Sequence, residues 1–248
     1  MSTVATQASS PATVPAAGKS LPGRILGVLF APRATYAEVV ARPRWLGVFL
    51  VIVLLGGAGT FAFLSTAVGR QAMLDEQVRT MESFGMKIPD DAYQRMEAGI
   101  GRARYMGAIG QVVFSGIVAL VIAGIAIGVF NALLGGDATF KQVFSVVVHS
   151  GVVMLLSQLF GLPLAYARES MSGATNLAVF APFLDENSFA ARALGGIDLF
   201  LLWWIISLSI GLGVLYRKRT QPIATALIAI YVAIGLVIAA IKTAVSGA

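Results

Sequence analysis

The chain has 248 residues, of which 57% are hydrophobic and only 12% are charged, with a formal net charge of +6. A soluble domain carries about 25% charged residues, so lipid must cover part of this surface, and the absence of cysteine excludes disulfides and thiolate chemistry. The basic residues flank apolar segments and form no patch interleaved with aromatic residues, so we expect no nucleic-acid partner.

Two different segments precede the first long apolar run. Residues 1–18 are rich in Ser, Ala, Thr and Pro, without charge or periodicity, which predicts a disordered tail. Residues 19–44 are basic, and apolar residues recur at helical spacing on both sides of Pro32. Such a segment is typical of an amphipathic interfacial helix lying against the anionic lipids of a membrane. A plain linker before the first span is the alternative interpretation.

Residues 45–242 predict an all-α integral membrane protein whose domain is a bundle of five transmembrane helices. Each predicted span is uncharged or nearly so, and each is long enough for a hydrocarbon core of about 30 Å. The predicted spans cover about 45–66, 105–134, 140–162, 194–216 and 223–241. The second is longer than a bilayer requires and should tilt, and Pro163 is expected to end the third.

A helical hairpin outside the membrane is predicted between the first two spans, within residues 70–104. The apolar positions Leu74, Val78, Met81 and Phe84 predict its first helix. Pro89 then breaks the chain, and Asp90 is expected to cap the second helix. A second polar loop, 168–192, separates the third and fourth predicted spans.

Two basic clusters predict the orientation of the bundle. One is the segment 19–44 and the other is the short turn Arg217-Lys218-Arg219 between the last two predicted spans. Lys and Arg concentrate in short cytoplasmic segments. We therefore expect the amino terminus inside and the carboxyl terminus outside.

Glycines within the spans predict close contacts between helices. Gly56 and Gly57 lie in the first span, and Gly124 and Gly128 form a GxxxG pair in the second. Small residues at this spacing let two helix backbones approach each other in a membrane.

Four polar residues lie in or near the predicted spans: Asn131, His149, Gln158 and Asp198. His149 is the only histidine, and a hydrogen bond to serine or backbone is favoured over a proton relay or ligand contact. Asp198 suits the start of a helix, where carboxylates are stabilised. Asn131 and Gln158 are interpreted as interhelical hydrogen-bonding residues rather than as a path for a solute.

No catalytic motif is present in the sequence. It has no P-loop, HExxH motif, nucleophile elbow or dinucleotide fingerprint. Asp137 has no second acid in the preceding span with which to form an aspartyl-protease pair, and a zinc site needs ligands beyond His149. We therefore predict no catalytic centre, no cofactor and no metal.

Three stretches together resemble the Yip family of Ypt/Rab-interacting membrane proteins, in its bacterial form. They are 29–43 (LFAPRATYAEVVARP), 135–143 (GGDATFKQV) and 197–213, which begins IDLFLLW and ends GLG. The resemblance covers about 21–241 and implies a five-span membrane protein. The tail lacks the long cytosolic region of eukaryotic members, so a Rab-type GTPase partner is doubtful.

The resemblance and the lack of catalytic motifs lead to two hypotheses about function. The first is a non-enzymatic adaptor or assembly factor in a bacterial cytoplasmic (inner) membrane, where it contacts lipids and binds other membrane proteins or itself. The alternative is a component of a transport system, either the partner of an ABC-type exporter or a small-solute permease or channel. An intramembrane enzyme is the least favoured of the classes considered.

Overall fold

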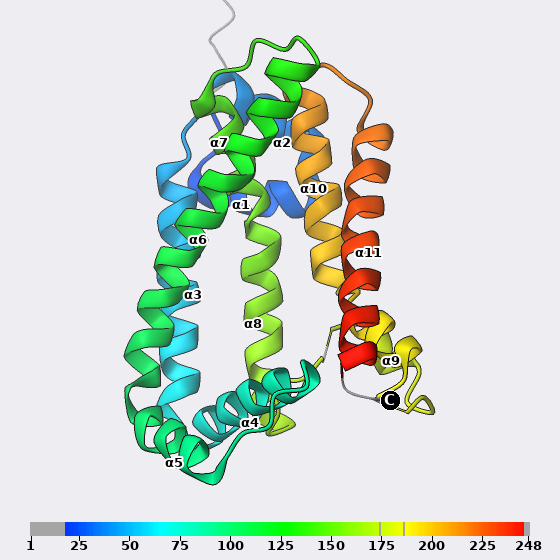
Figure 1. The fold of residues 1–248 in the computed structure, drawn as a ribbon. Helices are drawn as coiled ribbons and strands as arrows, with labels where there is room; N and C mark the ends of the chain where they lie inside the picture. The colour runs from blue at the N-terminus through cyan, green and yellow to red at the C-terminus, as the bar shows by residue number, and fades with distance from the viewer. Residues whose placement is uncertain (1–17, 174, 186, 246–248) are drawn as a thin grey trace, which may run out of the picture.

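The computed structural model describes residues 18–173, 175–185 and 187–245. All the regular elements within these ranges are helices (Figure 1). The disorder predicted for residues 1–18 falls, apart from Gly18, outside the described residues. The α-helices are α1 (Leu21–Phe30), α2 (Pro32–Ala41), α3 (Leu46–Ser65), α4 (Ala67–Ser83), α5 (Asp90–Gly99), α6 (Ala103–Ile127), α7 (Phe140–Ser150), α8 (Val152–Ala167), α9 (Phe189–Gly195), α10 (Leu199–Leu215) and α11 (Thr220–Val245). Short 3₁₀ segments cover Ile100–Arg102 and Leu177–Phe180, and a π-helical turn, Gly128–Leu133, continues α6.

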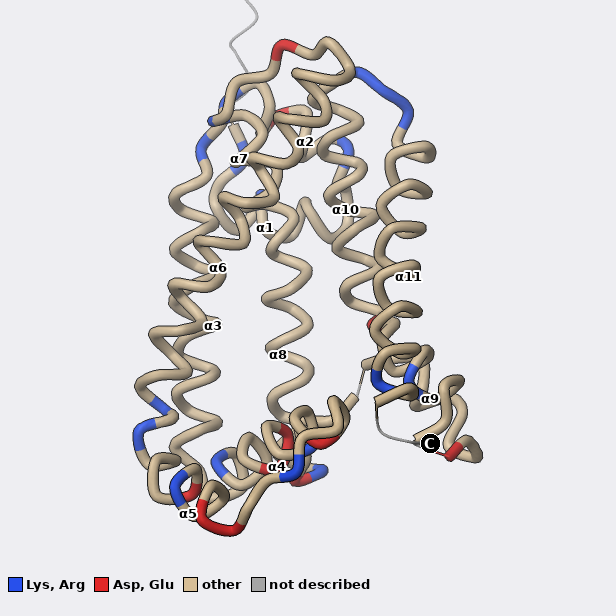
Figure 2. Tube along the Cα trace, viewed as in Figure 1, with Lys and Arg blue, Asp and Glu red and all other residues tan. Residues whose placement is uncertain are grey.

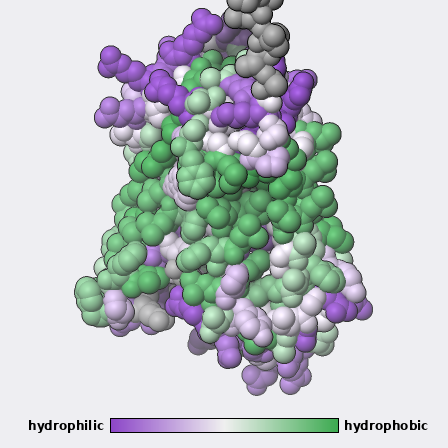
Figure 3. Space-filling view, turned by 180° about the vertical axis from the view of Figure 1, so that it is seen from behind, coloured by the Kyte–Doolittle hydropathy of each residue, from purple (hydrophilic) through white to green (hydrophobic). Residues whose placement is uncertain are grey.

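The long helices run along a common direction, and α7 and α8 together occupy the middle of the bundle (Figure 1). The 134–139 turn, α2 and the Arg217–Arg219 turn lie at one end, which we call the basic end (Figures 1 and 2). The opposite end, which we call the hairpin end, is formed by α4, α5 and α9. An apolar band lies between two polar ends in the space-filling view (Figure 3), as a membrane-spanning protein requires.

Four helical segments are long and apolar enough to cross a membrane: Leu46–Ser65, Asp90–Leu133, Phe140–Ala167 and Thr220–Val245. The remaining predicted span, 194–216, corresponds to α10, which has 17 residues. At 1.5 Å per residue this helix is about 26 Å long, less than a hydrocarbon core of about 30 Å. The all-helical membrane fold is therefore confirmed with four candidate spans.

The predicted end of the third span at Pro163 is wrong. The chain turns at Gly151, and α8 then continues through Pro163 to Ala167. A proline inside a helix removes one backbone hydrogen bond. Here Leu162 and Ala165, on either side of it, pack against Phe63 and Leu64 at the end of α3, and this packing stabilises the last turn.

The two helices of residues 19–44 are packed into the bundle. Val28, Tyr36 and Val39 are each at most 1% exposed, and α2 contacts α7 and α10. These three side chains therefore face protein, whereas Leu26 and Phe30 are exposed, and contact of this segment with lipid stays a prediction. Lys19 joins the two helices, because its Nζ donates to Thr35 Oγ1 at 2.7 Å.

The predicted hairpin is present as two helices with different surroundings. α4 buries Ala72 and Leu74 next to α3 and α8, whereas α5 has no buried residue. Asp90 is not the cap that was expected, because Pro89 occupies the N-cap position. Asp90 and Asp91 instead lie in the first turn, where a carboxylate still interacts favourably with the helix dipole.

Candidate functional site

His149 lies on α7 in the middle of the core and is completely buried. Its Nδ1 lies 2.7 Å from Ser145 O, one turn earlier in the same helix, and a carbonyl can only accept, so Nδ1 carries the proton. Nε2 is then a bare acceptor, and it has no partner among the described residues. The expected hydrogen bond to the backbone is therefore present at Nδ1. Nε2, in contrast, is buried without a hydrogen bond in the described part of the chain.

Gln158 joins α8 to α3 at Gly56, one of the four predicted contact glycines. Its Nε2 donates to Gly56 O at 3.0 Å and to Thr60 Oγ1 at 2.8 Å. A Cβ added at Gly56 would lie 2.8 Å from Gln158 Oε1, and one added at Gly57 would meet Val112 of α6 at 3.5 Å. Gly56 and Gly57 therefore lie where α3 contacts its neighbours.

Asp198 is the N-cap of α10 at the hairpin end. Its carboxylate accepts from Leu201 N at 2.9 Å and from the Thr175 hydroxyl. Its backbone N donates to Tyr231 OH of α11 at 2.8 Å, and that hydroxyl donates in turn to Gly196 O. This arrangement connects the 168–192 loop region, α10 and α11, and it is the helix-capping role expected for Asp198.

Asn131 lies in the π-helical turn at the basic end. Its Nδ2 donates to Ala138 O and its Oδ1 accepts from Tyr216 OH, both at 2.8 Å. Phe130 stacks on the Tyr216 ring with centroids 4.6 Å apart. A Cβ at Gly136 would lie 2.7 Å from that ring, so only glycine fits there. The GGD turn is thus built around Tyr216.

The four polar residues do not form one site. None of them hydrogen-bonds to another in the described part of the chain, and each joins a different pair of segments, except that His149 bonds within its own helix. No group of three His, Asp or Glu residues within those ranges could hold a metal ion. Gly124 and Gly128 are exposed, and a Cβ at either would meet nothing within 4 Å among the described residues.

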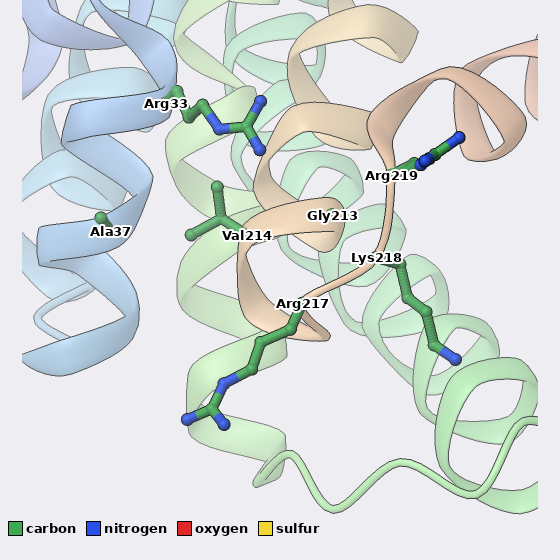
Figure 4. Close-up of a pocket in the computed structure, with 7 residues that line it drawn as sticks. All are labelled: Arg33, Ala37, Gly213, Val214, Arg217, Lys218 and Arg219. Atoms are coloured by element: carbon green, nitrogen blue, oxygen red, sulfur yellow. The ribbon is translucent and has the colours of Figure 1, made fainter.

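Two adjoining hollows at the basic end bring distant segments of the chain together. The first, which we call the cationic basin, has a volume of about 420 Å³ and is lined by Arg33, Ala37, Gly213, Val214, Arg217, Lys218 and Arg219. The second has a volume of about 520 Å³ and is lined largely by residues 134–138, Gln142 and 214–218. In Figure 4 Arg33 points from α2 toward the floor formed by Gly213 and Val214, while the three basic side chains of the turn fan outward.

The lining of the basin is positively charged, and the nearest acid among the linings is Asp137, which lines the adjoining hollow with Arg217 and Lys218. No acidic residue lines the basin itself. None of its four cationic side chains has a hydrogen bond or an ion pair to any residue in the described ranges; the ion pairs found there, Arg79–Glu76 and Arg95–Asp91, lie on α4 and α5. An arrangement of this kind can hold an anion through charge-assisted hydrogen bonds.

Some residues of these sites were not singled out by the sequence. Tyr36 lies in the segment 19–44, of which only the apolar periodicity was interpreted, yet it is fully buried and shares a 2.8 Å hydrogen bond with Ser207 of α10. Burial raises the pKa of Tyr36 above its ordinary value, so its hydroxyl stays protonated. Tyr231 was not considered, and Arg33 was read only as part of a cluster. No spacing rule relates residues this far apart in the sequence.

An all-helical chain with an apolar band, four candidate spans and polar residues used mainly to join helices defines a multi-pass membrane protein. A family model of the Yip1 domain matches residues 26–241, so the chain belongs to the Yip family. This confirms the resemblance stated above. No curated protein and no solved structure matches the chain.

Proposed function

We propose that the chain is a non-enzymatic adaptor or assembly factor that binds other membrane proteins through the exposed face of α6. The observation that carries this proposal is the unused GxxxG pair. Gly56 and Gly57 are consumed by contacts within the bundle, whereas Gly124 and Gly128 face open space. Glycine destabilises a helix relative to alanine. At Gly124 and Gly128 no packing within the described residues offsets this destabilisation.

The residues around the pair suit a second transmembrane helix. Leu120, Val121 and Ile125 are all more than half exposed, so the glycines form a shallow groove between apolar side chains. Helices associate in membranes by such small-residue contacts, since burial from water supplies no driving force there. We therefore place the partner's helix, from another protein or from a second copy, along α6.

The same proposal includes five spans, with the amino terminus in the cytoplasm of a bacterium and the carboxyl terminus outside. α10 and α11 run in opposite directions between the two ends of the bundle (Figure 1), which supports counting the short α10 as a span in a locally thinned bilayer. The 217–219 turn and α2 lie at the same end (Figures 1 and 2), which supports placing both on the cytoplasmic side.

Replacing both Gly124 and Gly128 by leucine is expected to abolish association without destabilising the chain. A Cβ at either position meets nothing within 4 Å among the described residues, while a leucine side chain fills the groove that a second helix would need. The measurement is affinity purification in mild detergent after cross-linking in membranes. Gly110→Leu is the matched control, because Gly110 also faces open space on α6 but is not paired. Equal recovery of partner from both variants would contradict the proposal.

A transport component remains the second candidate function, and one observation favours it. His149 Nε2 is a buried acceptor without a partner among the described residues, as a proton-carrying group between two states would be. The absence of hydrogen bonds linking His149 to Asn131, Gln158 or Asp198 weighs against a continuous polar path.

The variant His149→Leu distinguishes these two functions. For an adaptor we expect this variant to raise the apparent melting temperature in detergent. It removes a buried nitrogen without a hydrogen bond, and such a group destabilises the folded state by about 1–3 kcal/mol. For a transport component it abolishes flux in liposomes. Lost flux with an unchanged or raised melting temperature would overturn the structural assignment of His149.

A further inference from the structure

We propose that the cationic basin binds the phosphate of an anionic phospholipid headgroup. The basin joins Arg33 at the start of α2 to the turn 217–219, which follows it by more than 180 residues. The inference does not depend on the adaptor proposal, because it concerns a different end and a different ligand.

The charge of the basin favours binding of an anion. Four cationic side chains line about 420 Å³ without an acidic residue among the lining. Like charges repel one another, and a bound anion reduces that repulsion. A phosphate group offers several acceptor oxygens, and arginine pairs with it through two parallel hydrogen bonds.

The position of the basin selects a lipid as the source of the phosphate. The turn 217–219 connects the ends of two apolar helices, α10 and α11, so it lies at the depth of the headgroups. The floor of Gly213 and Val214 belongs to the last turns of α10. The first turn of α11 adds the positive end of a 26-residue helix. Anionic lipids attract basic side chains at this depth.

The spread of the side chains points to a ligand at a surface rather than in a closed pocket. In Figure 4 the side chains of Arg217, Lys218 and Arg219 leave the turn in different directions, while Arg33 extends from α2 toward α10. A small free anion is held best by donors that converge on it. A lipid headgroup within a layer of other headgroups suits donors that fan out along the membrane plane.

Arg217 has a left-handed backbone conformation, which is unfavourable for residues other than glycine. Its φ is +52°, and Lys218 N donates to Gly213 O at 2.9 Å, which is the helix-ending motif that normally has glycine at this position. An arginine here strains the backbone where glycine would not. The retained side chain is explained if its charge serves the basin.

The test is a lipid titration of the full chain in detergent, followed by native mass spectrometry. We expect phosphatidylglycerol to bind in preference to phosphatidylcholine, and R33Q/R219Q to weaken phosphatidylglycerol binding by about tenfold or more, the effect of losing charge-assisted hydrogen bonds. R42Q/R44Q is the matched control. It removes two exposed arginines that precede α3 and do not line the basin. An equal loss in both double variants would show general surface attraction and overturn the site.

Two further arms separate strain from binding and lipid from free phosphate. R217G should raise the melting temperature in the absence of added lipid, because it relieves the positive φ, while weakening phosphatidylglycerol binding. Unchanged binding by R217G would overturn the role of this side chain. Soluble glycerol phosphate should fail to displace the lipid at equal concentration, and efficient displacement would overturn the lipid as the source.

Discussion

Replacing Tyr36 by alanine is expected to lower the free energy of unfolding by about 3–5 kcal/mol, the usual cost of removing a buried aromatic side chain. Tyr36 is 0% exposed and belongs to the main core cluster, where Val146 and Leu208 also lie. Its hydroxyl shares a hydrogen bond with Ser207. The change therefore leaves a cavity between α2 and α10 and a buried serine without its partner. Unfolding in mixed detergent micelles, followed by circular dichroism, measures the loss.

Two companion variants locate the source of this effect. Tyr36→Phe keeps the ring and removes only the hydroxyl, so we expect a loss of about 1–3 kcal/mol. Tyr166→Ala changes a tyrosine that is 51% exposed on α8 and should alter stability by about 0.5 kcal/mol or less. If Tyr36→Ala were no more harmful than Tyr166→Ala, α2 would not be part of the core.

The second large effect is expected for Gly69→Ala at the junction of α3 and α4. An added Cβ would collide with Phe63 O and lie 2.7 Å from the Phe63 carbonyl carbon. Both atoms are backbone, so the helix junction itself must move. Thr66 Oγ1 also accepts from Gly69 N at 2.9 Å, and this cap would be lost with the same movement. We expect a destabilisation of about 3 kcal/mol, at the upper end for overpacking.

Gly99→Ala is the matched control for the junction glycine. Gly99 ends α5, and a Cβ there meets nothing within 4 Å. Alanine should therefore leave stability unchanged or raise it by up to about 1 kcal/mol through its higher helix propensity. A thermal melt of both variants in one detergent provides the comparison. Similar melting temperatures for the two would show that the α3–α4 junction has more space than the contacts describe.

Periodicity and length predicted the parts of this fold that depend on local sequence. Long apolar runs identified α3, α6 and α11, because a run without charges has few alternatives to a membrane helix. The same rule overestimated the length of the fourth predicted span. Asp198 is the N-cap of α10, and the first residues of the predicted span belong to the separate helix α9. Pro163 was misread because the packing that tolerates it comes from α3, about 100 residues earlier.

The sites depend on contacts that no local pattern contains. Helical spacing found the apolar stripe of residues 19–44, but an amphipathic helix has the same spacing whether it covers lipid or protein. Glycines in a span likewise mark a surface that can be contacted without identifying the neighbour. Of the four glycines singled out, Gly56 and Gly57 lie against neighbouring helices in the described part of the chain, whereas Gly124 and Gly128 do not. The basic clusters were recognised separately, and their meeting in one basin required the fold.

The hydrogen bond between Tyr36 and Ser207 spans 171 residues of chain, and this separation sets an order of assembly. At 5–20 residues per second, a ribosome needs about 10–30 s to make that length. During this interval α2 has emerged while α10, against which it packs, does not yet exist. α2 therefore remains without this packing until α10 has been synthesised, and the core closes only after that. In a chain truncated before α10, the buried face of α2 would lack the helix against which it packs. We expect such a chain to be degraded by quality-control proteases.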